Sequence, residues 1–206
     1  MDGGGVEWMQ KVGEIDAAPR ALLALGANLS HRGQPPETTL LQAVALLEQR
    51  LGRALTLSRL YRTPAFPPGS GPDFVNAAAA LPWDDTADAL LGALHAVEAD
   101  LGRTRRLRWE PRIMDIDLIA LGAQVWPDAP TQQRWQSLTP EQAAQRTPDR
   151  LILPHPRLAE RSFVLAPLAD VAPDWCHPLT GLSVAQMLAA RPQAERAAVV
   201  VLDRNR

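Results

Sequence analysis

Cysteine and long hydrophobic runs are both scarce in this sequence of 206 residues. Cys176 is the single cysteine, which excludes an internal disulfide framework and any cysteine-rich zinc site. No run of about 18 apolar residues is present, so no segment is expected to span a bilayer. These absences favour a cytoplasmic protein without membrane contacts, in which Cys176 is an inert packing residue.

Lysine is also nearly absent, since 20 of the 21 basic residues are arginine and the exception is Lys11. Neither G-x-x-x-x-G-K-[ST] nor G-x-G-x-x-G occurs, so both common glycine-rich cradles for nucleotide phosphates are excluded. A net charge of −2 and a pI near 6.1 argue against binding of nucleic acid or anionic membrane through the overall field. Any phosphate binding must therefore be local.

The length of the chain is typical of one domain with a tail. Residues 1–19 carry acidic residues and lack the apolar segment of a signal peptide, so we expect a loosely ordered N-terminal extension there. Residues 20–206 are expected to fold as a single domain. Within it, the polar segment at about 127–149 lacks a continuous apolar face, which predicts a surface insertion.

Hydrophobic periodicity predicts the order of the main helices and strands. Strands are expected at 20–29, 55–66, 74–83 and 113–121, and helices at 35–52 and 85–102. The order is that of a ferredoxin-like βαββαβ core in the α+β class, with a mostly antiparallel four-stranded sheet and both helices packed on one face. Short helices near 139–142, 157–170 and 182–190 would be C-terminal helical additions.

Two aspartates interrupt the last of these strands. Side chains alternate along a strand, so Asp115 and Asp117 project from one face, about 7 Å apart. Like charges on one face of a strand lower stability, so the pair needs a cation. Arginines of the fold could supply it through salt bridges. Alternatively, the pair could bind Mg²⁺, which is usually held by one or two carboxylates together with substrate phosphates and waters.

An arginine cluster precedes the aspartate pair. Arg103, Arg105, Arg106, Arg108 and Arg112 fill five of ten positions. Such a run is often a solvated basic face, but beside two carboxylates it could hold a polyphosphate between guanidinium groups and metal. Glu98 adds a carboxylate to the apolar stripe of the helix before the cluster. It could pair with Arg103 or Arg105, or accept hydrogen bonds from a bound base.

Several separated motifs occur together in the chain. They are "LALGANL" at 23–29, "YRTPAF" at 61–66, "PDFVNAAAAL" at 72–81, "EADLGRTRRLRWEPRIMDIDLI" at 98–119 and "LPHPRLAERSFVLAPLADVAP" at 153–173. With them, the chain resembles the 6-hydroxymethyl-7,8-dihydropterin pyrophosphokinases of folate biosynthesis over roughly residues 20–190. The resemblance implies a ferredoxin-like fold and transfer of pyrophosphate from ATP to the pterin hydroxymethyl group, with release of AMP.

The resemblance also implies roles for individual residues. Asp115 and Asp117 match the aspartates that bind two Mg²⁺ ions, and with Arg103 and Arg112 they form the expected catalytic group. Phe74 and Phe163 match an aromatic pair that sandwiches the pterin. Asn76 and the backbone around Thr63 and Phe66 match groups on the pterin edge. Positions around ATP are matched by Glu98, Arg105, Trp109, Leu118, Arg150, Ile152, His155 and Arg161.

Individually, several of these residues have plainer explanations. Phe74 or Phe163 alone would more often be a core residue, and His155 alone a structural hydrogen-bonding residue. Together, two aromatic rings and one amide suit a flat heteroaromatic ligand. The nucleophile belongs to the substrate, so catalysis by positioning and charge neutralisation is expected. We also expect loops 64–72 and 103–112 to be mobile and to order over nucleotide.

Two other functional classes fit part of the sequence. A non-catalytic ferredoxin-like nucleotide- or RNA-binding module would use the arginines but does not need the aspartate pair. Another Mg²⁺-dependent transferase with an Asp-x-Asp site would not explain Asn76, Trp109 and the Pro-His segment. The expected partners are therefore small molecules, ATP and the pterin, bound by a monomer that does not bind nucleic acid.

Overall fold

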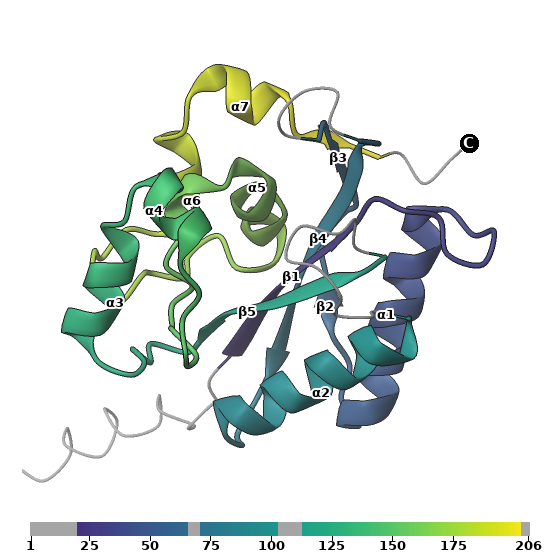
Figure 1. Cartoon of the computed structure of the whole chain (residues 1–206), viewed down its shortest axis with the longest axis horizontal. Helices are drawn as coiled ribbons and strands as arrows, with labels where there is room; N and C mark the ends of the chain where they lie inside the picture. Colours follow the sequence, from purple (N-terminus) through teal and green to yellow (C-terminus); the bar gives the residue numbers. More distant parts are fainter. Residues whose placement is uncertain (1–19, 66–70, 103–112, 203–206) are drawn as a thin grey trace, which may run out of the picture.

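The computed structural model describes residues 20–65, 71–102 and 113–202, and Figure 1 shows their arrangement. The expected N-terminal extension at 1–19, the arginine cluster at 103–112 and part of the 64–72 loop lie outside the described residues. Among the described helices, none is long and apolar enough to cross a membrane.

One antiparallel sheet organises the chain, in the order β5-β1-β4-β3-β6 with β2 paired to β4. Its strands are β1 (Arg20–Ala27), β2 (Thr56–Leu57), β3 (Tyr61–Thr63), β4 (Phe74–Pro82), β5 (Asp115–Leu121) and β6 (Val200–Val201). The prediction of an antiparallel sheet in an α+β protein is confirmed, but the sheet has six strands rather than four.

The extra strands have two origins. The strand expected at 55–66 is divided into β2 and β3 at Ser58. There the side chain, rather than a backbone carbonyl, accepts a hydrogen bond from β4. The Ser58 hydroxyl accepts a hydrogen bond from the Ala78 backbone N–H at 2.9 Å. The other extra strand, β6, comes from the C-terminal segment, where no strand was predicted, and it pairs with β3.

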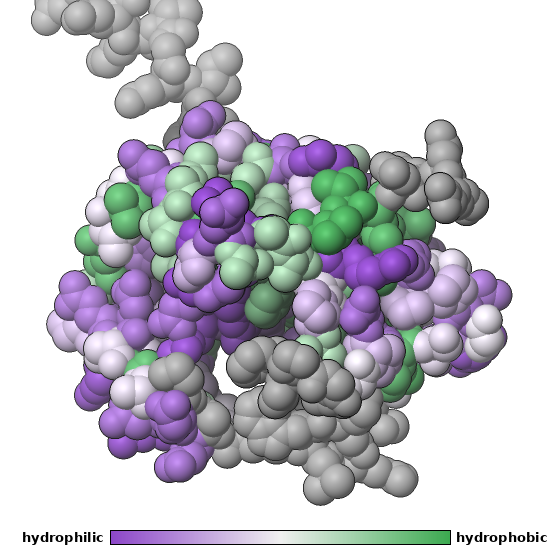
Figure 2. Space-filling view, turned by 90° about the horizontal axis from the view of Figure 1, so that it is seen from above, coloured by the Kyte–Doolittle hydropathy of each residue, from purple (hydrophilic) through white to green (hydrophobic). Residues whose placement is uncertain are grey.

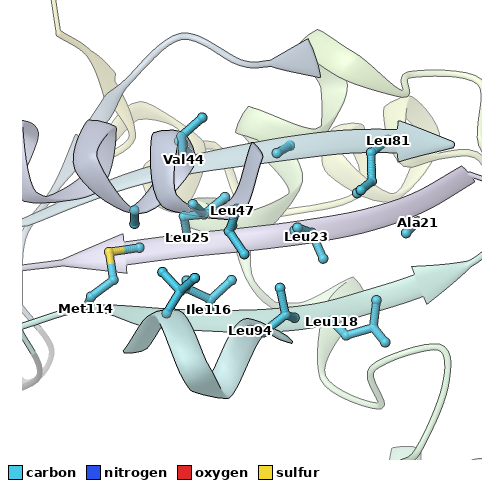
Figure 3. Close-up of a cluster of buried hydrophobic side chains, with 14 of the residues drawn as sticks. Ala21, Leu23, Leu25, Val44, Leu47, Leu81, Leu94, Met114, Ile116 and Leu118 are labelled. Atoms are coloured by element: carbon cyan, nitrogen blue, oxygen red, sulfur yellow. The ribbon is translucent and has the colours of Figure 1, made fainter. Parts of the chain in front are cut away.

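Two helices cover one face of the sheet, as predicted. Helix α1 (Pro36–Leu51) ends at Gly52, whose φ of +63° suits glycine, and α2 (Ala87–Asp100) begins where the Thr86 side chain accepts a hydrogen bond from Ala89 N–H at 3.1 Å. Leucines from both helices pack against every second residue of the strands (Figure 3). This face therefore carries the main hydrophobic core.

The other face is covered by the C-terminal half of the chain (Figure 1). The 3-10 helix η1 (Leu158–Glu160), α5 (Ser162–Val171) and α6 (Val184–Ala189) lie at the expected positions. Helix α5 packs on β4 and β1 and contributes Val164, Leu165 and Leu168 to a second core. The C-terminal helices, for which no face was predicted, thus cover the side of the sheet opposite α1 and α2. The short helix α7 (Gln193–Ala197) leads into β6 and was not expected.

Residues 127–149 contain two helices, α3 (Ala129–Gln136) and α4 (Pro140–Gln145). The predicted cap of α4 is present, since Thr139 and Gln142 form a capping box. Gln132 of α3 is fully buried and its Nε2 donates to Pro154 O at 3.3 Å. Residues 127–149 thus contact the loop that carries Pro154 and His155. That the segment is a surface insertion stays a prediction.

Candidate active site

Alternate residues of the central strands face opposite sides of the sheet, and this alternation builds the candidate site. On the α5 side, one row of paired residues crosses the sheet from β5 to β3. It consists of Asp115, Gly26, Asn76 and Tyr61. Asp117 pairs with Ala24 on the same side, two residues along β5. Small residues on β1 therefore leave space between the carboxylates and the amide.

Arg161 connects the aspartate pair to α5. It immediately precedes that helix, and its Nη1 lies 3.8 Å from Asp117 Oδ2. Both side chains are about one-third exposed, at 34% and 39%. Burial lowers the pKa of the Arg161 guanidinium below its ordinary value, while the carboxylates of Asp117 and Asp115 oppose that shift. The guanidinium stays charged and can neutralise a phosphate beside the carboxylates.

The donor set at this end of β5 fits Mg²⁺ rather than a closed protein-bound metal centre. Among the residues that the structure describes, no group of three or more His, Cys, Asp or Glu could hold a metal by itself. Asp115 and Asp117 are half-buried on one face and supply hard carboxylate oxygens. Mg²⁺ commonly takes one or two carboxylates and completes its shell with waters and substrate phosphates.

His155 is held beside β5 by its backbone and its ring. Its N–H donates to Ile119 O at 2.8 Å, and its ring Nδ1 accepts from Arg157 N–H at 3.1 Å. Burial is the main cause that lowers the pKa of His155 to about 3, and the charge of Arg161 adds to it. The ring is therefore neutral near pH 7, and its proton resides on Nε2 as a hydrogen-bond donor.

A cavity of about 500 Å³ opens between the strands, the start of α5 and the C-terminal segment. The strands contribute Thr63, Pro64, Phe74 and Asn76; the region around the start of α5 contributes Glu160, Arg161, Ser162 and Phe163; the C-terminal segment contributes Glu195, Ala198 and Val199. Two aromatic rings and one amide thus share a cavity of the size that small ligands occupy. Arg161 belongs both to this cavity and to the aspartate site.

The amide of Asn76 is fixed inside the cavity. It is 5% exposed, and its Nδ2 donates to Thr63 Oγ1 at 2.8 Å. A Cβ on Gly26 would lie 3.2 Å from Asn76 Oδ1, closer than most Cβ contacts, so only glycine leaves the amide undisturbed. The sheet thereby presents a preoriented amide to a ligand.

Glu98 has a structural contact in addition to its expected role near ATP. It is 1% exposed, and its Oε1 accepts a hydrogen bond from Ile116 N–H at 2.9 Å. Ile116 lies between the two aspartates, so Glu98 helps to fix the strand that carries them. Its suggested partners Arg103 and Arg105 lie outside the described residues.

The remaining expected site residues are dispersed. The side chain of Leu118 packs in the α1/α2 core, which leaves its main chain as the part that could contact a nucleotide, and Ile152 is 5% exposed. Arg150 forms a salt bridge with Asp149 at 3.1 Å and lines a different cavity at the start of α2, so the structure does not bring it to the aspartates. Phe66, Arg103, Arg105, Trp109 and Arg112 lie outside the described residues.

Sequence reasoning missed several residues of the cavity. Gly26 was not predicted to be a site residue, although it lies beside Asn76. Glu195 and Val199 lie in the C-terminal segment, for which we predicted no element. The apolar, β-branched run "VVVL" at 199–202 was the available signal for a further strand.

Comparison with known proteins agrees with this geometry. The profile of the 7,8-dihydro-6-hydroxymethylpterin-pyrophosphokinase (HPPK) family matches residues 22–173. The chain is 36% identical over 173 residues to a 2-amino-4-hydroxy-6-hydroxymethyldihydropteridine pyrophosphokinase of Pseudomonas aeruginosa, covering 84% of this chain and 92% of that protein. It is also 36% identical over 152 residues to the protein of the same name from Bacillus subtilis, covering 73% and 77%.

Solved structures show the same fold in longer proteins. Wild-type Plasmodium falciparum HPPK-DHPS superposes with a TM-score of 0.56 at 13% identity, covering 83% of this chain. An HPPK-DHPS in complex with substrates superposes with a TM-score of 0.59 at 12% identity, covering 84% of this chain. Our chain spans less than half of each, 44% and 43%.

These matches define the chain as an ATP-dependent diphosphotransferase. The chain belongs to the HPPK family, because the family profile covers most of it and relatives above 30% identity match along most of their length. The resemblance inferred from the sequence motifs is thus confirmed.

Proposed function

We propose that this protein transfers pyrophosphate from ATP to the hydroxymethyl group of 6-hydroxymethyl-7,8-dihydropterin and releases AMP, in folate biosynthesis. The observation that carries the proposal is the position of Arg161. Its guanidinium lies 3.8 Å from Asp117 and also lines the cavity that contains Phe74, Asn76 and Phe163. A ring-binding cavity thus opens directly beside a site for phosphates.

The cavity suits a flat bicyclic substrate. Phe74 and Phe163 would stack on the two faces of the pterin, and Asn76 with Thr63 would hydrogen-bond its edge. The Arg161 guanidinium lies 5.9 Å from the centre of the Phe163 ring, and this cation–π contact stabilises the positions of both side chains. In this pose the hydroxymethyl oxygen points towards β5.

Asp115 and Asp117 would hold Mg²⁺, and two ions are proposed. The bound metal would supply positive charge that neutralises the ATP phosphates. Arg161 contributes a guanidinium to the same phosphates, and the neutral His155 donates a hydrogen bond through Nε2. Glu98 positions the strand through Ile116.

We expect no covalent protein intermediate. The attacking oxygen belongs to the pterin, and the protein contributes alignment and charge stabilisation. Arg103 and Arg112 are proposed to join Asp115 and Asp117 in the catalytic group, Arg105 and Trp109 to bind ATP, and the backbone around Phe66 to hydrogen-bond the pterin edge. Leu118, Arg150 and Ile152 are proposed to contact the nucleotide farther along β5.

We also propose a fold topology, domain bounds, an oligomeric state and a location for the protein. Strands β5, β1, β4 and β3 with α1 and α2 form a ferredoxin-like core, and residues 20–206 act as one domain with a surface insertion at about 127–149. We propose a monomer in the cytoplasm. Cys176, which was expected to be a packing residue, is instead exposed, and an exposed free thiol persists in a reducing compartment.

Nucleotide product analysis tests the function. The full chain is incubated with ATP, Mg²⁺ and the hydroxymethyl dihydropterin, and nucleotides are separated chromatographically. We expect AMP in amounts equal to the pyrophosphorylated pterin, and no AMP without pterin or with excess chelator. ADP as the sole nucleotide product would instead indicate a different transferase, and nucleotide binding without turnover would indicate a non-catalytic module.

A further inference from the structure

Helix α3, part of the segment expected to be a surface insertion, contacts the loop that carries His155. Its Gln132 donates from Nε2 to Pro154 O at 3.3 Å, one residue before His155. In Figure 2 the side of the molecule that holds α3 and α4 is on the left, as in Figure 1, and carries mainly hydrophilic residues. Gln132, by contrast, is turned inwards and is the buried residue of α3.

Glutamine is an unfavourable choice for this buried position. The Gln132 side chain has no exposed surface, and its Oε1 has no hydrogen-bond partner within the described part of the chain. A buried oxygen without a partner lowers stability, so an apolar residue of the same size would be less costly here. Packing therefore does not explain the amide, whereas the hydrogen bond to Pro154 does.

The peptide group between Pro154 and His155 is hydrogen-bonded at both ends. Its oxygen accepts from Gln132 on α3, and its N–H, that of His155, donates to Ile119 O on β5 at 2.8 Å. A peptide group is planar, so two hydrogen bonds on opposite sides fix the orientation of the whole plane. The direction in which the His155 side chain leaves the backbone is thereby set between α3 and β5.

The imidazole ring of His155 is oriented by the same part of the chain. Arg157 N–H donates to His155 Nδ1 at 3.1 Å, which leaves the ring proton on Nε2. The Arg157 guanidinium in turn donates to Leu138 O at 2.9 Å, and Leu138 lies between α3 and α4. Residues 127–149 thus contact the loop on both sides of His155.

We propose that Gln132 is a positioning residue for the nucleotide phosphates. By holding the peptide group between α3 and β5, it keeps the Nε2–H of His155 directed at the phosphates bound beside Asp117. This inference rests on the proposed function for the identity of the ligand. None of the described residues that line the pterin cavity belongs to the loop at 153–157, so the effect of Gln132 is confined to the nucleotide.

The test compares Gln132→Met with wild type in the full chain. Methionine resembles glutamine in length and flexibility but has no N–H donor. Gln133→Met is the matched control, because it makes the same substitution at the next residue of α3, which is exposed.

Three kinds of measurement separate positioning from structure. Binding of a nonhydrolysable ATP analogue with Mg²⁺ is measured directly, and the AMP assay gives kcat and KM for the pterin. ¹H–¹⁵N NMR spectra report which ring nitrogen of His155 carries the proton, with the signals assigned by their loss in His155→Gln. Thermal melts report stability.

In Gln132→Met we expect the ATP analogue to bind about 5- to 10-fold more weakly, as for the loss of one hydrogen bond. The value of kcat should fall about 10-fold, because a misaligned donor stabilises the phosphates less. KM for the pterin and the melting temperature should stay close to those of wild type. The His155 signals should change from the Nε2–H tautomer to a mixture of tautomers, and Gln133→Met should match wild type throughout.

Unchanged nucleotide binding, kcat and His155 signals in Gln132→Met would overturn the inference. Equal weakening of nucleotide and pterin binding with a lower melting temperature would also overturn it, because Gln132 would then have only a structural role. If the methionine variant is misfolded, Gln132→Asn takes its place, since the shorter side chain withdraws the amide from Pro154. Absence of AMP from wild type would refute the proposed function instead, and the NMR comparison would still show whether Gln132 orients His155.

Discussion

The two faces of the sheet are built from alternate residues of the same strands and differ in almost every property. Towards α1 and α2, β1 presents Leu23 and Leu25, which are fully buried among other aliphatic side chains. Towards α5, the same strand presents Ala24 and Gly26, which leave room beside polar groups. One face thus has close-packed large side chains, whereas the other has small ones and a cavity.

Successive side chains of a strand point to opposite faces of the sheet, so residues that stabilise the core and residues that build the site can occupy neighbouring positions. A substitution at one position of β1 changes the core, and a substitution at the next changes the site. On β5 the same rule sets Ile116 and Leu118 against the core and Asp115 and Asp117 on the opposite face, at the candidate site. Substitutions on the two faces should therefore affect different measurements.

The largest effect is expected for the aspartate pair. Asp115→Asn or Asp117→Asn should lower Mg²⁺-dependent turnover on the order of 100-fold or more, because the phosphates lose charge stabilisation. Without metal, repulsion between the two carboxylates is relieved, so the melting temperature in chelator should hold steady or rise. Turnover at saturating Mg²⁺ and thermal melts in chelator test both parts, with Asp174→Asn on an exposed turn as the control.

Clear destabilisation in chelator with turnover largely preserved would instead show that the pair neutralises arginines of the fold. Asp117 is the more sensitive position for this alternative, since Arg161 lies 3.8 Å away.

On the opposite face, Leu23→Ala should lower stability without changing the chemistry. Leu23 has no exposed surface, so truncation leaves a cavity and should reduce the free energy of unfolding by about 2–5 kcal/mol. Urea unfolding followed by tryptophan fluorescence measures this change. At a temperature where the variant is fully folded, kcat should match wild type within a factor of about two. A large fall in kcat there would mean that the two faces are not independent.

A smaller and more local effect is expected for Gly26→Ala. The added methyl group meets Asn76 Oδ1 at 3.2 Å and should turn the amide away from the ligand. KM for the pterin should rise about 10-fold, comparable to the loss of one hydrogen bond, while KM for ATP stays constant. Gly92→Ala is the matched control, because a Cβ there meets nothing within 4 Å and helix propensity favours alanine.

The smallest effect concerns the pH dependence of stability. His155 has a folded pKa of about 3, below its ordinary value of 6.5. The unfolded chain therefore binds a proton first as the pH falls, so the contribution of His155 to stability is complete above pH 6.5 and decreases below it. The loss should be about 1 kcal/mol at pH 6. Urea unfolding at pH 7.5 and pH 6 should show a smaller difference in His155→Gln than in wild type.

The framework of the fold was predictable from local patterns. The leucine spacing and Gly52 gave the first helix, and the alternation around Asp115 and Asp117 gave the face of the carboxylates. The division of the 55–66 strand was not predictable, because it depends on Ser58 meeting the Ala78 backbone across the sheet. Neither was the covering of the second face by α5, since an apolar segment does not reveal which surface it will cover.

The site was predictable only in part, for a similar reason. Motifs identified Thr63, Phe74, Asn76 and Phe163, which the structure brings to one cavity. Contacts that depend on distant parts of the chain were missed, among them the approach of Glu195 to Ser162, which is 33 residues away along the sequence. Spacing along a sequence carries information about one strand or helix and little about the pairing of remote segments.

The outer edge of β5 has a consequence for self-association. An exposed strand edge is a template on which another polypeptide can add as a further strand, and this is a common route to aggregation. Here the edge is engaged within the same chain at two places: Ile116 N–H donates to Glu98, and Ile119 O accepts from the His155 N–H. Glu98 and the loop of His155 thus also make these two backbone groups inaccessible to a neighbouring molecule, so the protein can be concentrated with less risk of edge-to-edge polymerisation through β5.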